Sequence, residues 1–106
     1  MLGQAIVTIK DKKWIVNVVS TYLELTQGLG GLMELATGAS MFFDLGYEQI
    51  IEVTTAPMLF SLDIAFFSQD MTVTTVNYHV EPGNFVISQE PARYFLEVNA
   101  GEFAGI

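Results

Sequence analysis

Hydrophobic residues recur along this chain in short runs that are rich in β-branched and aromatic side chains and that end at turn residues. In residues 62–67, alternation places Leu62, Ile64 and Phe66 on one face and the other three side chains on the opposite face. A period of two is typical of strands rather than helices. The pattern therefore predicts strands at residues 5–9, 14–19, 41–43, 50–55, 62–67, 72–80 and 93–98.

One segment departs from this pattern. Thr21 and Glu24 have the spacing of a capping box, in which the two side chains satisfy free backbone amides at a helix start. A short α-helix is therefore predicted at residues 22–27, ended by the glycine-rich residues 28–31. Many short strands with one helix predict a mostly β fold, either an antiparallel β-sandwich or a partly open barrel.

Residues 1–106 are predicted to form a single domain, because the chain has the usual size of one and contains no repeat, low-complexity tract or linker. Apolar residues make up 51% of the chain, which is enough for a core, but acidic residues interrupt every stretch long enough to cross a bilayer. A soluble domain without membrane insertion is therefore expected. The first residues lack the pattern of a signal peptide, and the localisation stays open.

The charge is strongly acidic and unevenly spread. The formal net charge is −8, while Lys10, Lys12 and Lys13 lie near the start and Arg93 is the fourth cation. The three lysines fall between two predicted strands, which indicates a solvated hairpin turn. Nucleic-acid binding is not expected, because it requires a cationic surface that displaces counterions from phosphates.

Two local patterns could hold a ligand. Residues 28–31 lack the preceding strand and following helix of a phosphate-binding loop, and are interpreted as a helix end and a tight turn. His79 and Glu81 are two positions apart, which would place both on one strand face as two metal ligands. No third ligand is evident, so a hydrogen-bonded histidine at a strand end is the simpler interpretation. The chain has no cysteine and no serine in a nucleophile motif, and no cofactor is expected.

Two acids inside apolar strands, Asp63 and Glu97, are the strongest candidates for chemistry. Two partly buried carboxyls with different pKa values could perform acid–base hydrolysis, as in glycosidases. Arg93 is on the predicted face of Glu97, so a structural cluster of Asp63, Arg93 and Glu97 that compensates buried charge is the preferred interpretation. Calcium binding by the acidic surface is a further alternative, although the EF-hand spacing is missing.

Four blocks resemble a known family. They are Gly-Leu-Met at 31–33, Met-Phe-Phe at 41–43, Leu-Asp-Ile-Ala-Phe at 62–66 and Ala-Arg-Tyr-Phe-Leu-Glu-Val-Asn-Ala-Gly at 92–101. In their order and spacing, the chain from residue 30 onward resembles the family called domain of unknown function 192. Ser61 stands where the family usually has proline, and residues 54–57 depart from its pattern. The resemblance implies a β-rich domain with one helix, exported in many relatives, without an assigned reaction or ligand.

The family also usually continues into a further turn and a closing strand. The chain is therefore expected to lack that final C-terminal strand and to expose a sheet edge, which could pair with another chain. Several phenylalanines beyond the needs of a thin core point to an exposed aromatic surface, and a homodimer and a monomer are both open. The sequence predicts a non-enzymatic binding or accessory domain for a small ligand or protein. The alternative is a carboxylate-based hydrolase that uses Asp63 and Glu97.

Overall fold

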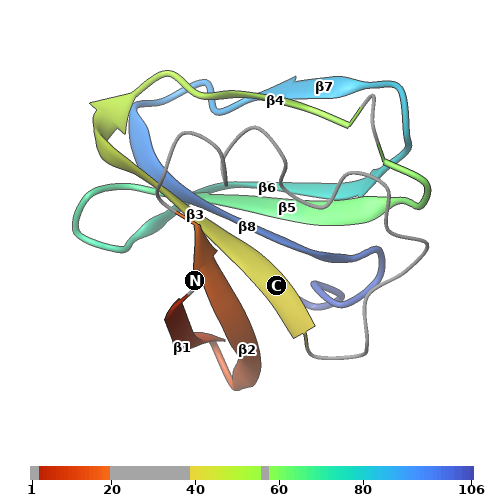
Figure 1. Cartoon of the computed structure of the whole chain (residues 1–106), viewed down its shortest axis with the longest axis horizontal. Helices are drawn as coiled ribbons and strands as arrows, with labels where there is room; N and C mark the ends of the chain where they lie inside the picture. The colour runs from red at the N-terminus through yellow and green to blue at the C-terminus, as the bar shows by residue number, and fades with distance from the viewer. Residues whose placement is uncertain (1–2, 20–38, 56–57) are drawn as a thin grey trace.

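The computed structural model describes residues 3–19, 39–55 and 58–106 (Figure 1). Its strands are β1 (Gly3–Ile9), β2 (Lys12–Val19), β3 (Ala39–Gln49), β4 (Glu52–Thr54), β5 (Leu62–Phe67), β6 (Val73–Val80), β7 (Phe85–Ile87) and β8 (Ala92–Asn99). The predicted mostly β fold is confirmed. The helix predicted at 22–27 and the glycines of 28–31 lie outside the described residues, and the described part of the chain contains no helix. It therefore holds no helix that could span a bilayer.

Six strands form one sheet in the order β1-β2-β3-β8-β5-β6, and β4 pairs with β7 in a second sheet. Within the described ranges the larger sheet is not closed into a barrel, since β1 and β6 form its two edges. The prediction of antiparallel pairing throughout is wrong at one place, because β2 and β3 run parallel. A parallel pair requires a long connection that returns the chain to the same end of the sheet, and residues 20–38 separate these two strands.

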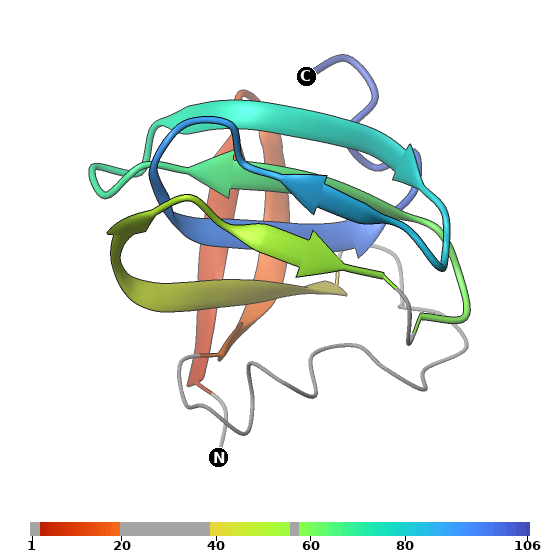
Figure 2. The ribbon, with the colours of Figure 1, turned by 90° about the horizontal axis from the view of Figure 1, so that it is seen from above.

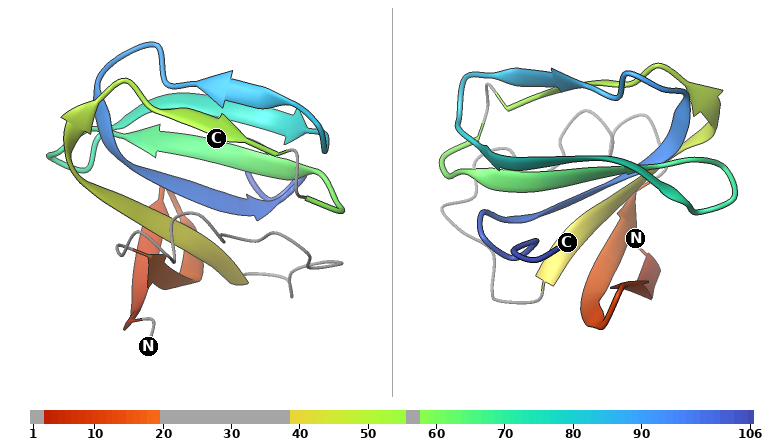
Figure 3. Two further views of the ribbon diagram at one scale, coloured as in Figure 1. Left: turned by 45° about the horizontal axis from the view of Figure 1, so that its top comes forward. Right: turned by 180° about the vertical axis from the view of Figure 1, so that it is seen from behind.

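The two-stranded sheet lies over one face of the six-stranded sheet, as the views in Figure 3 show. The space between them is filled by the inter-sheet core, which consists of Met41, Phe43, Ile51, Val53, Met58, Leu62, Ile64, Phe66, Val80, Ala92 and Phe95. The opposite face carries the hairpin core, which consists of Val7, Ile9, Trp14, Val16, Phe42, Ala65, Phe67, Leu96, Val98 and Phe103. The side chains of β5 alternate between the two cores, so all six of its residues are buried.

The turns after β8 pack against the β1–β2 hairpin. Trp14 meets the ring of Phe103 edge-on at a centroid distance of 5.1 Å and donates its Nε1–H to Glu102 Oε1 at 2.8 Å. Lys12 Nζ donates to the carbonyl oxygen of Ala104 at 2.6 Å. The predicted hairpin is confirmed, but its turn is shorter than predicted, because Lys12 and Lys13 belong to β2. Lys12 is not simply solvated, since it ties the hairpin to the end of the described chain.

Candidate functional site

Asp63 is 1% exposed and lies on the hairpin-core side of β5. Its Oδ1 accepts the backbone N–H of His79 at 2.8 Å, and its Oδ2 accepts those of Gly101 at 2.9 Å and Phe103 at 3.0 Å. The pairing of β5 with β6 shifts opposite Asp63, and the bulged His79 has a φ of 51°. The carboxylate thus satisfies amides that the ladder leaves without a partner, and it joins the β6 bulge to the turn after β8.

Gly101 supplies one of these amides from a left-handed backbone conformation, with a φ of +97°. Replacing Gly101 by alanine is expected to lower the free energy of unfolding by about 1–2 kcal/mol, because a Cβ is strained in this region of backbone space. Chemical denaturation would measure the change. Gly3→Ala is the control, since Gly3 also has open space for a Cβ but no positive φ. Equal effects of the two substitutions would contradict a conformational requirement at Gly101.

Glu97 lies on the other face of the six-stranded sheet. It is opposite Met41 on β3 and Ile64 on β5, and it is 4% exposed. Burial raises the pKa of Glu97 to about 8, so the carboxyl is mostly protonated at neutral pH. Asn77 on β6 is also opposite Ile64, and its buried Nδ2 has no hydrogen-bond partner among the described residues. The row of paired residues across β3, β8, β5 and β6 therefore combines the buried carboxyl of Glu97 and the buried amide nitrogen of Asn77 with the apolar Met41 and Ile64.

The structure does not bring Asp63 and Glu97 together. Asp63 is opposite Val98 and Glu97 is opposite Ile64, so the two acids occupy neighbouring register positions and face opposite sides of the sheet. The backbone of β5 and β8 separates the carboxyls. A glycosidase places its two carboxyls about 5–10 Å apart on either side of one substrate bond. This arrangement offers no such common position to a substrate.

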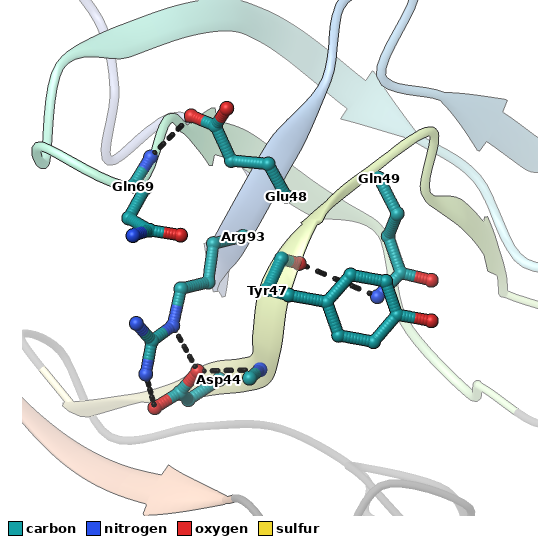
Figure 4. Close-up of polar contacts among 7 residues, drawn as sticks. Asp44, Tyr47, Glu48, Gln49, Gln69 and Arg93 are labelled. Atoms are coloured by element: carbon teal, nitrogen blue, oxygen red, sulfur yellow. Dashed lines mark hydrogen bonds and ion pairs between the residues drawn. The ribbon is translucent and has the colours of Figure 1, made fainter.

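Arg93 forms a bidentate ion pair with Asp44 (Figure 4). Its Nε donates to Asp44 Oδ1 at 2.9 Å and its Nη2 donates to Asp44 Oδ2 at 3.2 Å. The guanidinium also lies 5.0 Å from the centre of the Tyr94 ring. Hydrogen bonding to Arg93 lowers the pKa of Asp44. The arginine of the predicted cluster is thus paired with Asp44 instead of Asp63 or Glu97, and the sequence analysis missed Asp44 because the β3–β8 register brings it opposite Tyr94.

The same region is tied to the turn between β5 and β6. Glu48 Oε2 accepts the backbone N–H of Gln69 at 2.8 Å, and Gly46 donates its N–H to Asp44 Oδ1 at 2.8 Å (Figure 4). Gly46 has a φ of 90° and lies where the β3–β8 register is interrupted. These contacts hold the bent outer half of β3 in place. The polar side chains of this region therefore have a structural role.

His79 and Glu81, the predicted pair of metal ligands, do not lie on a common strand face. His79 is exposed, and its positive φ breaks the alternation on which a common strand face depended. Glu81 is exposed and lies beyond the end of β6. Across residues 3–19, 39–55 and 58–106, no three histidine or acidic side chains are grouped as a metal site would require. The backbone amide of His79 does contribute to the fold, through Asp63.

A different surface stands out on the two-stranded sheet. Alternation buries Ile51 and Val53 and turns Ile50 and Glu52 outward, while the pairing register places Phe85 and Ile87 on the same outward side. The outer apolar face consists of Ile50, Glu52, Thr54, Phe85 and Ile87. Figure 2 looks onto this face, with β4 and β7 in front of the larger sheet.

Its apolar side chains are well exposed, at 67% for Phe85, 53% for Ile50 and 38% for Ile87. A depression of about 330 Å³ adjoins them and is lined by Glu52, Val53, Thr54 and Phe85. The sequence predicted an exposed aromatic surface but did not locate it, because β7 is only three residues long, which is too short to show a period. The Pro-Gly-Asn turn before Phe85 is the one signal that could have located it.

Comparison with protein families gives one match that covers most of the chain. The model of DUF192, described as Uncharacterized ACR, COG1430, matches residues 5–106. The chain belongs to the DUF192 family. The two longest blocks of the resemblance, residues 62–66 and 92–101, form the paired strands β5 and β8 and the turn that Asp63 binds. Asp63 thus connects the family's characteristic segments in this DUF192 domain.

Two crystal structures are similar to this DUF192 domain. One, described as a "putative transcription regulator" from Sinorhizobium meliloti 1021, has 26% identity and a TM-score of 0.82, and the match covers 92% of this chain and 78% of that one. The other, a protein of unknown function from Novosphingobium aromaticivorans DSM 12444, has 21% identity and a TM-score of 0.82, over 94% and 74% of the two chains. The second likeness concerns the fold alone. No curated protein matches.

Proposed function

We propose that this DUF192 domain is a non-enzymatic binding module, and that it holds a cationic, apolar segment of another protein on the outer apolar face. The observation that carries the proposal is the gathering of Phe85, Ile50 and Ile87 on one exposed sheet face beside a depression. Exposed aromatic side chains beside a recess are typical anchors of protein interfaces. The candidate acids Asp63 and Glu97 are buried on opposite faces and offer no alternative centre for chemistry.

The negative charge of the chain and of Glu52 favours a positively charged partner. Glu52 lines the depression and is exposed within the outer apolar face. The chain as a whole carries a formal net charge of −8, so its field attracts positively charged segments and repels acidic ones. A segment with an apolar side chain for the depression and a lysine or arginine for Glu52 fits both features.

DNA is the second candidate, raised by the description of the Sinorhizobium meliloti protein. Three of the four cations of this chain already have partners, which leaves Lys13 as the exposed cation for a phosphate. Lys10 and Lys12 donate to backbone carbonyls of Gly105 and Ala104, and Arg93 is paired with Asp44. Phosphate binding would have to disrupt these contacts and overcome the acidic field. A protein segment is therefore the occupant that we propose.

A labelled peptide of alternating lysine and leucine tests the proposal by fluorescence anisotropy at low and physiological salt. Binding is expected, with Phe85→Ala weakening it by about tenfold, which corresponds to about 1.4 kcal/mol. Glu52→Lys should weaken it further at low salt, because it reverses the charge beside the depression. The substitution of Phe85 should leave the fold stable, since the ring is mostly exposed.

Leu59→Ala is the matched control, because Leu59 is 56% exposed and belongs neither to the outer apolar face nor to the hairpin. A peptide in which glutamate replaces lysine controls for charge. If the lysine peptide fails to bind, or binds Phe85→Ala as tightly as the unchanged chain, the proposed site is wrong. If short duplex DNA binds instead, the second candidate replaces it.

A further inference from the structure

The two edges of the six-stranded sheet differ in how they are protected. β6 is interrupted by two register shifts against β5, and such bulges prevent an edge from pairing with another chain. β1 pairs with β2 in unbroken register over seven residues, Gly3–Ile9, and contains neither proline nor a charged residue. Among the strands that the structure describes, β1 is therefore an unprotected edge and β6 is a protected one.

The hairpin turn determines which residues of β1 form backbone hydrogen bonds to β2 and which point their backbone groups outward. Ile9 and Lys12 flank the two-residue turn and close it, so they form a hydrogen-bonded pair. Because hydrogen-bonded and non-hydrogen-bonded pairs alternate in an antiparallel ladder, the backbone groups of Gln4, Ile6 and Thr8 point away from β2. These three residues offer donors and acceptors to a strand alongside β1.

We propose that β1 pairs antiparallel with β1 of a second copy of this chain, about a two-fold axis at Ile6. Ile6 would lie opposite Ile6 of the partner subunit, and Gln4 opposite Thr8 of the partner subunit. This register uses only the outward-pointing backbone groups, and it is self-complementary as a two-fold interface requires. The two larger sheets become one continuous sheet.

The surface beside this edge favours a second copy over another partner. Ile6 and Ile15 are opposite each other on one face of the hairpin and are 68% and 61% exposed. The two-fold axis brings this pair next to the same pair of the partner subunit, which covers apolar surface from both sides. Residues 3–19 contain three lysines and one acidic residue, all at residues 10–13, so two hairpins approach without the repulsion between acidic surfaces. Antiparallel pairing about Ile6 places the two lysine-containing turns at opposite ends of the interface, which keeps their positive charges apart.

Dimerisation leaves the outer apolar face open. β1 and β2 lie at the opposite end of the molecule from β4 and β7, as Figure 1 shows. The inference is therefore independent of the proposed function, although a dimer would present two such faces and increase the avidity for a partner with two binding segments.

Sedimentation equilibrium of the 106-residue chain over a range of concentrations tests the dimer. A monomer–dimer equilibrium is expected, and Ile6→Lys should raise its dissociation constant by about tenfold or more, because two ammonium groups then face each other across the axis. Leu59→Lys is the matched control, because it introduces a lysine at a similarly exposed aliphatic residue outside both the hairpin and the outer apolar face. A chain that is monomeric throughout, or a dimer that Ile6→Lys leaves unchanged, would overturn the proposal.

The register can be tested separately, because the chain has no cysteine. Under mild oxidation, Ile6→Cys is expected to form a disulfide-linked dimer, since paired residues in an antiparallel ladder are within disulfide reach. Gln4→Cys alone should not, whereas a mixture of Gln4→Cys and Thr8→Cys should. Equal cross-linking of all single variants would rule out this register. Ile6→Lys should still bind the lysine–leucine peptide, so failure of the dimer and failure of the outer apolar face are distinguishable.

Discussion

Replacing Asp63 by alanine is expected to lower the free energy of unfolding by roughly 2–5 kcal/mol, because one buried and two partly buried backbone amides lose their acceptor at once, and a buried amide without an acceptor costs about 1–3 kcal/mol. Those amides belong to His79, Gly101 and Phe103. A loss of this size is a large part of the stability of a small domain. Urea denaturation followed by the fluorescence of buried Trp14 would measure it.

Asp63→Asn should fall between alanine and the unchanged chain, since an asparagine keeps one acceptor oxygen but turns an amide group toward the remaining donors. Glu81→Ala is the control for removal of an acid, because Glu81 is exposed, and it should change stability by less than about 0.5 kcal/mol. If Asp63→Ala unfolds at the same urea concentration as the unchanged chain, the carboxylate does not have the structural role given to it here.

The stability of the domain is expected to fall as the pH rises from about 4.5 to about 8, through Glu97. Burial raises the pKa of Glu97 from 4.5 to about 8 in the folded state. Between these values the folded chain retains a proton that the unfolded chain has released, so the free energy of unfolding decreases by up to about 1.4 kcal/mol per pH unit. Urea denaturation at several pH values would measure the slope.

Glu97→Gln should remove this slope and make the domain more stable than the unchanged chain at pH 8, because glutamine is neutral at every pH. Asp44 affects the free energy of unfolding in a different pH range. Its pKa is lowered by Arg93, so its stabilising effect is lost only as the pH falls below about 4. Glu81→Gln serves as the control at an exposed position. A slope that persists in Glu97→Gln would mean that another group causes it.

The strands that were predicted well are those with a long, regular period. In β5 and β8 the alternation of residues 62–67 and 93–98 matches the observed strands closely. β3 extends to Gln49, well beyond the predicted residues 41–43, because the irregularity at Gly46 breaks the period. The parallel pairing of β2 with β3 depends on the path of the connection and leaves no local signal in either strand.

The candidate residues were identified more readily than their contacts. Asp63 was noticed because an acid inside an apolar strand is costly unless it is paired, but its partners are backbone amides, which carry no side-chain signal. The partner of Arg93 depends on the register between β3 and β8, which the sequence does not reveal. Alternation assigned Asp63 and Glu97 to strand faces, yet only the pairing of β5 with β8 shows that they face opposite sides.

In this account Asp63 maintains the fold, binding takes place on the outer apolar face, and the buried Glu97 takes no part in binding. The most direct test is an anisotropy titration of the lysine–leucine peptide with the unchanged chain, Phe85→Ala and Glu97→Gln in parallel. The account predicts that Phe85→Ala weakens binding by about tenfold, as for a typical interface anchor, and that Glu97→Gln binds as the unchanged chain does. Loss of binding in Glu97→Gln, with full binding in Phe85→Ala, would contradict the account and place the function in the interior.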